Sequence, residues 1–204
     1  MLSSAAIGFD ARVTGAERPP WDADRRALYL LRTDVRVPAS TDRLVWPSLF
    51  DLAAAPAAPA WTGANAMLWD DLDRLRGFVA ERWPQPVPSH AIVAVTWVSD
   101  RGFAEAGATG PYREPTKPSA TSPAWSVLGF DVADGSLLSG LTNCGYAPDE
   151  VDVLRARWGP RLNESHLFSS IGDALAFREV ADARVPEHAP FFVYGLYLVG
   201  EAGR

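Results

Sequence analysis

The distribution of hydrophobic and polar residues along the chain predicts several β-strands. Residues 31–37 alternate Leu, Thr and Val with Arg and Asp, which is typical of a strand with one buried face. Three later segments, 91–98, 125–132 and 191–199, are largely apolar and rich in β-branched and aromatic residues. Such segments are typical of strands whose two faces are both covered, as in the centre of a sheet.

A helix is predicted over residues 65–83, because apolar side chains recur there every three or four positions and Asn65 is suited to be the N-cap. Residues 148–158 and 170–183 predict two further helices. A proline and two acidic residues open the first of these, and Ser170 opens the second in the pattern of a capping box.

These elements predict a single α+β domain over residues 1–204. Strands and helices do not alternate regularly, which argues against a doubly wound sheet, and no repeat of about 20–50 residues is visible. We therefore expect a mixed or antiparallel sheet of about four or more strands with three main helices. Residues 1–27 lack a sustained period and are predicted to be irregular, and the Gly-, Pro- and Ser-rich residues 99–124 predict a long loop.

Composition and charge narrow the classes of function. The chain has 204 residues, of which 48% are hydrophobic and 22% charged, as in ordinary globular proteins. Its formal net charge of −6 and its pI of about 5.0 argue against nucleic acids and anionic membranes as partners and favour a basic protein. The N-terminal residues do not resemble a signal peptide, and no apolar segment is long enough to span a membrane, so we expect a cytoplasmic location.

The single cysteine, Cys144, carries the main enzymatic alternative. With His166 as its base, Cys144 would be the nucleophile of a thiol-dependent hydrolase. The residues beside Cys144 do not match the signatures of known cysteine proteases, and a buried cysteine without chemistry is the simpler interpretation. The three histidines lack the spacing of metal ligands and no phosphate-binding glycine loop is present, so we expect no metal and no cofactor. The sequence therefore favours a binding protein over an enzyme.

The segment between Lys117 and Arg155 contains no basic residue, and acidic residues accumulate in it. Carboxylates without a local countercharge would attract a basic protein, and an aromatic ring among them would anchor it. The predicted partner-binding residues are Asp131, Asp134, Tyr146, Asp149, Glu150 and Asp152. A structural alternative exists for residues 149–152, because acids in the first turn of a helix are favoured by the helix dipole.

Residues 128–146 (LGFDVADGSLLSGLTNCGY) and 184–197 (RVPEHAPFFVYGLY) resemble stretches of bacterial proteins of this size, among them immunity proteins of polymorphic toxin systems. The resemblance implies a small cytoplasmic protein that neutralises a cognate toxin domain by docking on it, and it brings no catalytic motif. A second alternative is a structural subunit that forms an oligomer through its tryptophans. The sequence leaves the oligomeric state open.

Overall fold

The described part of the chain folds into an antiparallel four-stranded sheet with three α-helices, which confirms the predicted single α+β domain. The structure is a computed structural model and describes residues 3–13, 68–83, 86–87, 89–99, 121–135, 137–141, 146–147, 149–163, 165 and 167–200. Its elements, in chain order, are β1 (Ser3–Val13), α2 (Leu72–Arg82), β2 (His90–Ser99), β3 (Ser126–Ala133), α4 (Val151–Trp158), the 3-10 helix η2 (Gly159–Arg161), α5 (Ile171–Arg184) and β4 (Phe192–Leu198).

The strands lie in the order β1-β2-β4-β3, and each is antiparallel to its neighbours. The central position of β2 and β4 explains their largely apolar sequences, because consecutive residues of both strands are buried on opposite faces of the sheet. The strands predicted at 91–98, 125–132 and 191–199 are thereby confirmed as β2, β3 and β4.

The edge strand β1 corrects the prediction of an irregular segment for residues 3–13, while residues 14–27 lie outside the described residues. The sequence pattern does not predict this strand because it contains Asp10 and Arg12, and charged residues are rare at buried strand positions. Both side chains are buried, and Arg12 Nε lies 2.8 Å from Asp10 Oδ2. Residues two apart share one face of a strand, so an ion pair occupies positions where sequence patterns require apolar residues.

Helix α4 lies within its predicted segment and α5 ends one residue beyond its own, whereas α2 begins later than predicted. The N-cap of α2 is Asp71, whose side chain accepts a hydrogen bond from the backbone N–H of Arg74, while Asn65 lies outside the described residues. Trp69 is not helical because its backbone pairs with β1. Ser170 caps α5 as predicted.

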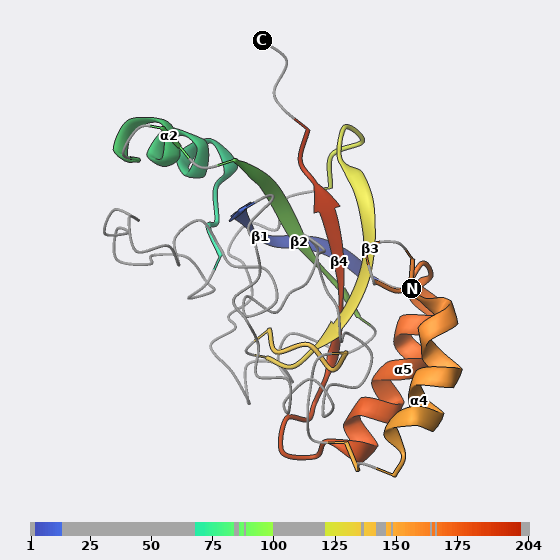
Figure 1. Ribbon diagram of the computed structural model, residues 1–204. Helices are drawn as coiled ribbons and strands as arrows, with labels where there is room; N and C mark the ends of the chain where they lie inside the picture. Colours follow the sequence, from blue (N-terminus) through green and yellow to red (C-terminus); the bar gives the residue numbers. More distant parts are fainter. Residues whose placement is uncertain are drawn as a thin grey trace.

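All three helices cover one face of the sheet (Figure 1). Helix α2 packs over β1 and β2 at one end, and α5 packs over β3 and β4 at the other, where Phe177, Val132 and Val193 belong to one core cluster. Helix α4 adds an outer element, which contributes Val151 and Trp158 to the same core as α5. The opposite face of the sheet is also buried, and its apolar side chains include Val93, Val95, Trp97, Phe192, Tyr194 and Leu196.

Each edge strand forms an antiparallel bridge to a residue just before a helix, and β3 forms a second bridge, between Ala133 and Ser139. Phe9 in β1 exchanges two backbone hydrogen bonds of 2.8 Å with Trp69, and Phe130 in β3 exchanges two of 2.9 Å with Phe168. These bonds cover backbone groups that an open edge would offer to other chains. They also place the starts of α2 and α5 beside the sheet.

The strand predicted at 31–37 and most of the loop predicted at 99–124 lie outside the described residues. Within the described ranges, no helix is both long enough and apolar enough to cross a membrane.

Replacing Gly8 or Gly129 with alanine is expected to lower the free energy of unfolding by about 1–3 kcal/mol, because the added methyl group would overpack each bridge. A Cβ on Gly8 would lie 2.6 Å from the Cβ of Leu68, and one on Gly129 would lie 2.6 Å from the Cβ of Leu167. The φ of Gly129, 142°, adds backbone strain to the second variant. The control is Gly77→Ala in α2, where the new Cβ meets no atom within 4 Å and should stabilise the helix by about 0.5–1 kcal/mol. Urea denaturation measures all three, and equal effects would contradict the expected close approach.

The stability of the protein should depend on pH through Asp173 in α5. Hydrogen bonds from Ser170 and Arg161 lower the pKa of Asp173 below its usual value. An acid whose pKa is lower in the folded state stabilises the fold above its unfolded pKa, and that contribution is lost as the pH falls through the folded pKa. The wild type should therefore be more stable than Asp173→Asn at neutral pH, and the two should converge below about pH 4. Denaturation midpoints between neutral pH and pH 3 test this, and a constant difference would argue against it.

Candidate functional site

A tight turn follows β3 and places polar residues at one end of the sheet. The backbone N–H of Asp134 donates to the carbonyl of Leu138 over 3.0 Å, and the N–H of Leu137 donates to the carbonyl of Asp134 over 3.1 Å. The Asp134 side chain accepts a further bond from the N–H of Leu138. Leu137 has a φ of 63°, which is uncommon for a residue other than glycine. The turn is thus held by three hydrogen bonds on Asp134 alone.

Asp131 lies inside the protein, with no exposed surface. Its Oδ1 accepts hydrogen bonds from the hydroxyl of Ser139 over 2.7 Å and from the backbone N–H of Val132 over 2.9 Å. The same hydroxyl accepts a bond from the N–H of Leu141. Buried carboxylates need such donors to offset lost hydration. Asp131 therefore joins β3 to the segment that follows the turn.

His188 reaches the turn from the connection between α5 and β4. Its Nδ1 lies 2.9 Å from Oδ2 of Asp134, and the His188 side chain is 32% exposed while that of Asp134 is 9% exposed. The connection is fixed by the N–H of His188, which donates to Val185, and by the N–H of Phe191, which donates to the Asp182 carboxylate. The pair is therefore held from both sides and has limited access to solvent.

Two buried tyrosines bind the backbone of the same region. The Tyr194 hydroxyl donates to the carbonyl of Asp134 over 3.3 Å, and the Tyr146 hydroxyl donates to the carbonyl of Gly140 over 3.1 Å. Burial raises the pKa of Tyr146 well above its usual value, so this phenol keeps its proton and remains a donor. We call Asp131, Asp134, Ser139, His188 and Tyr194 the turn cluster.

The turn cluster contains one element of acid–base catalysis, a carboxylate beside an imidazole. Hydrolysis would also need a nucleophile bonded to the histidine. The Ser139 hydroxyl donates to Asp131 instead, and Cys144 and His166 lie outside the described residues. No group of three or more metal-binding side chains occurs in the described part of the chain. The hydrogen bonds of the turn cluster thus hold the turn in place.

The other predicted acids lie at the start of α4 and are accessible to solvent. Asp149 is exposed, and the side chain of Asp152 is 94% exposed. Arg155 Nη1 lies 3.3 Å from Asp152 Oδ1, and Arg184 Nη1 lies 2.8 Å from Glu150 Oε1. Arginines thus lie beside two acids of the segment between Lys117 and Arg155, in which every charged residue is acidic. The local negative charge is therefore smaller than the sequence predicts.

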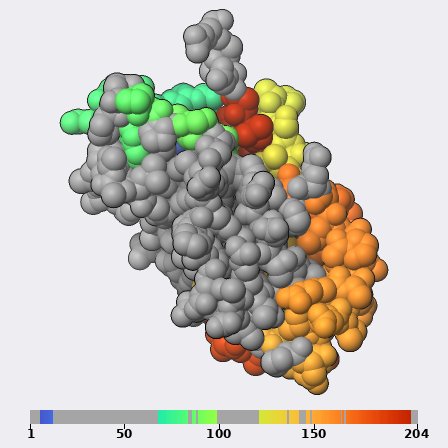
Figure 2. All heavy atoms as spheres, viewed as in Figure 1, coloured from blue at the N-terminus to red at the C-terminus, as the bar shows by residue number. Residues whose placement is uncertain are grey.

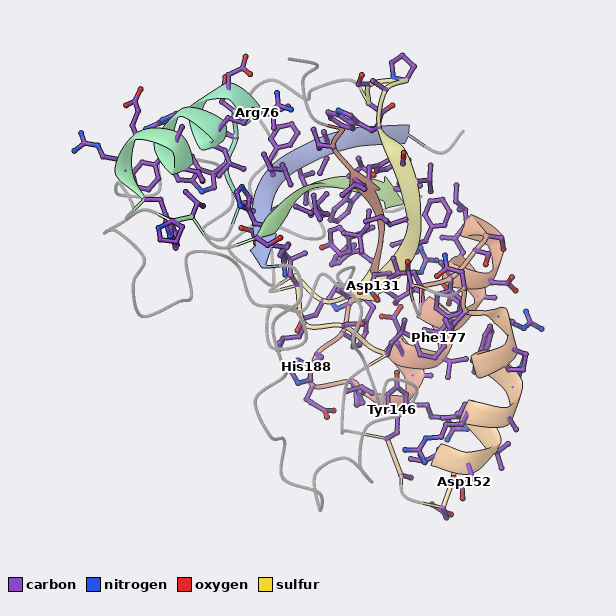
Figure 3. All side chains as sticks on the ribbon, turned by 45° about the horizontal axis from the view of Figure 1, so that its top comes forward. Arg76, Asp131, Tyr146, Asp152, Phe177 and His188 are labelled. Carbon is purple, nitrogen blue, oxygen red and sulfur yellow. The ribbon has the colours of Figure 1, made fainter. Side chains whose placement is uncertain are left out.

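The six predicted partner-binding residues therefore fall into two separate groups. Figure 3 shows Asp131 and Tyr146 toward the end of the sheet near His188, and Asp152 on the outer helix α4. Asp131, Asp134 and Tyr146 are buried, so they do not offer side chains to a partner in this structure. The side chains of these three residues form hydrogen bonds within the fold, so the six predicted residues do not lie together at the surface. A docking role for Asp149, Glu150 and Asp152 stays a prediction.

His188 belongs to the turn cluster although no sequence pattern singles it out. Its partner Asp134 is 54 positions away, and the contact depends on the sheet placing β3 beside β4. Ser139 is closer to Asp131 in sequence, but its role depends on the turn geometry. The available signal is the concentration of polar residues around an Asp-Gly pair, which predicts a turn and not its contacts.

No protein-family model matches the chain, and the searches of curated proteins and of solved structures also found no match.

A double-mutant cycle should detect a coupling of about 1 kcal/mol between Asp134 and His188, because both partners are partly shielded from water. The variants are Asp134→Asn, His188→Gln and the double variant, each measured by urea denaturation. The exposed pair Asp152 and Arg155 is the control, and its cycle should give a coupling near zero. Equal couplings in the two cycles would mean that the turn cluster is no firmer than a surface ion pair.

Proposed function

We propose that this protein is a non-enzymatic binding protein of the immunity type, which neutralises a basic, nuclease-type toxin domain by docking through α4. The residues that would meet the partner are the exposed ones on the outer side of this helix. They form what we call the α4 surface: Asp149, Asp152, Val153, Ala156 and Arg157.

The exposure of Val153 is the observation that carries the proposal. This side chain is 67% exposed, more than Val127 or Leu198, the other exposed large hydrophobic residues among those described. Asp149 lies just before the helix, four residues ahead of Val153, and Asp152 is the neighbour of Val153 in sequence. An apolar centre with a charged rim is the usual composition of a protein–protein contact.

The position and anchoring of α4 also support docking. Figure 2 shows α4 and α5 forming one continuous stretch of surface at the side of the molecule. Val151 and Trp158 fix α4 to the core, and the ion pair between Glu150 and Arg184 joins its start to the end of α5. A surface that is already ordered loses less conformational entropy on binding than a flexible one does.

The charge of the chain favours a basic partner. Arg155 offsets part of the charge of Asp152, but Asp152 remains almost fully exposed, and Asp149 is exposed beside it. The formal net charge of the whole chain is −6. Long-range attraction of this kind raises association rates and weakens as salt is added.

The test measures association with a panel of purified basic nuclease domains of bacterial toxins by stopped-flow fluorescence. We expect Asp149→Lys/Asp152→Lys to slow association with the domain that binds by about tenfold at low salt and by less at high salt. Val153→Asp should mainly speed dissociation, because it places a charge in the apolar centre of the contact.

The matched control is Asp70→Lys/Asp73→Lys, which reverses two acids at the start of α2 whose side chains are 51% and 93% exposed. This variant has the same net charge as the first and should change the association rate much less. Equal slowing by both variants would show a general charge effect and no docking at α4. Absence of binding by every domain in the panel would overturn the proposed partner class.

A further inference from the structure

Two five-residue segments in the edge strands are closely similar. β1 contains Ile7-Gly-Phe-Asp-Ala11 and β3 contains Leu128-Gly-Phe-Asp-Val132. Each segment carries an irregularity in its pairing at the same place, immediately before its glycine. The aspartate is fully buried in both. The likeness thus extends from sequence to backbone register and burial.

The segment that bridges each edge strand is similar as well. Phe9 pairs with Trp69, and Phe130 pairs with Phe168, each through two backbone hydrogen bonds. Each bridging aromatic residue follows a leucine whose Cβ is the atom nearest to a Cβ built on the strand's glycine, 2.6 Å away in both cases. The same contact, between a Gly-Phe-Asp segment of an edge strand and a leucine followed by an aromatic residue, therefore occurs at both edges of the sheet.

The helices that follow these pairs begin in the same way. Two residues after Trp69, the Asp71 side chain accepts a hydrogen bond from the N–H of Arg74. Two residues after Phe168, Ser170 accepts the corresponding bond from Asp173. Each helix is followed by a central strand that is antiparallel to its own edge strand, β2 after α2 and β4 after α5.

The pairing of the two central strands is symmetric about one residue pair. Within the edge-to-centre pairs, Gly8 lies opposite Val95 and Gly129 lies opposite Leu196, so Val95 and Leu196 are equivalent. These two residues are also paired with each other across β2 and β4. The neighbouring pairs follow in mirror order: Ala94 with Tyr197 and Thr96 with Gly195 one step away, and Val93 with Leu198 and Trp97 with Tyr194 two steps away.

We infer that the domain is an internal duplication, in which two β-α-β units are joined as a dimer is joined, about a pseudo-twofold axis through Val95 and Leu196. The first unit consists of β1, α2 and β2, and the second of β3, α5 and β4. In each unit, the side of the central strand that faces away from its own edge strand pairs with the central strand of the other unit. Figure 1 agrees with this arrangement, because α2 and α5 lie at opposite ends of the sheet with β2 and β4 between them.

Comparison of the two units separates the features that both share from those found in one unit. Both units keep the buried aspartate, but Asp10 contacts Arg12 whereas Asp131 is bonded to Ser139. Its position on the strand is therefore shared, while its partner differs. The ion pair between Asp134 and His188 belongs to the second unit, and the described residues of the first unit show no equivalent pair.

Circular permutation of the full chain tests whether each unit is a complete building block. One permutant begins at Thr121 and ends at residue 120, with the natural ends joined by about 14 Gly and Ser residues, which span roughly 20 Å on average. The control is opened between Pro86 and Val87, inside the first unit, with the same joining segment. The first permutant should keep one cooperative unfolding transition within about 5 °C of the wild type, and the second should lose clearly more. Equal losses, or failure of the first alone, would overturn the inference.

Exchange of the axial residues tests the symmetry itself. Val95→Leu and Leu196→Val should each lower the unfolding midpoint, and the double variant should recover most of the loss, because equivalent positions accept the exchanged pair. Leu75→Val/Val79→Leu in α2 is the matched control, since it exchanges the same buried residue types at positions that are not equivalent, and it should show no recovery. An axial double variant that loses as much as the sum of its single variants would refute the twofold axis.

Discussion

The backbone hydrogen bonds that close the two sheet edges govern the arrangement of the rest of the structure. A four-stranded sheet has two edges, and each would expose unpaired N–H and C=O groups. Here Trp69 and Phe168 each satisfy one edge residue, and the glycine beside that residue lets the bridging segment come close. The helix that follows each bridge then starts next to the sheet and covers one face. The same bridge therefore both covers a residue of the sheet edge and positions the helix that follows, and this arrangement is found at both edges.

Buried polar residues complete this arrangement and add specificity to it. Asp10 with Arg12, and Asp131 with Ser139, place polar atoms on a sheet face that is otherwise apolar. Such groups are tolerated only where their partners are in position, so each selects one register of the strand that carries it. Asp134 with His188 acts at the end of the sheet, where it joins two connections that are far apart in sequence.

The sequence predicts the parts of this fold that follow local patterns. The strands β2, β3 and β4 and the helix α5 with its Ser170 cap are predicted because apolar periodicity and capping act over a few residues. β1 is missed because its alternation is replaced by a buried ion pair, and α2 begins late because Trp69 is paired with β1. The duplication escapes a search for short repeats, since its matching segments begin at Ile7 and Leu128, which is farther apart than the whole length of the first unit. The contacts of the candidate site depend on these long-range pairings, so the sequence identifies its residues only in part.

The division of the acidic residues bears directly on how function arose on this fold. Asp131 occupies a position that the first unit also fills with aspartate, Asp10, and its hydrogen bonds are internal. A residue required by both units is explained by folding and gives no support to a partner. The acids of α4 lie outside the features that the described parts of the two units share, and Asp152 contributes little stability because it is exposed almost completely. Selection on binding acts most freely on residues that the fold does not need, which is why the outer side of α4, and not the buried turn cluster, is the stronger candidate for recognition.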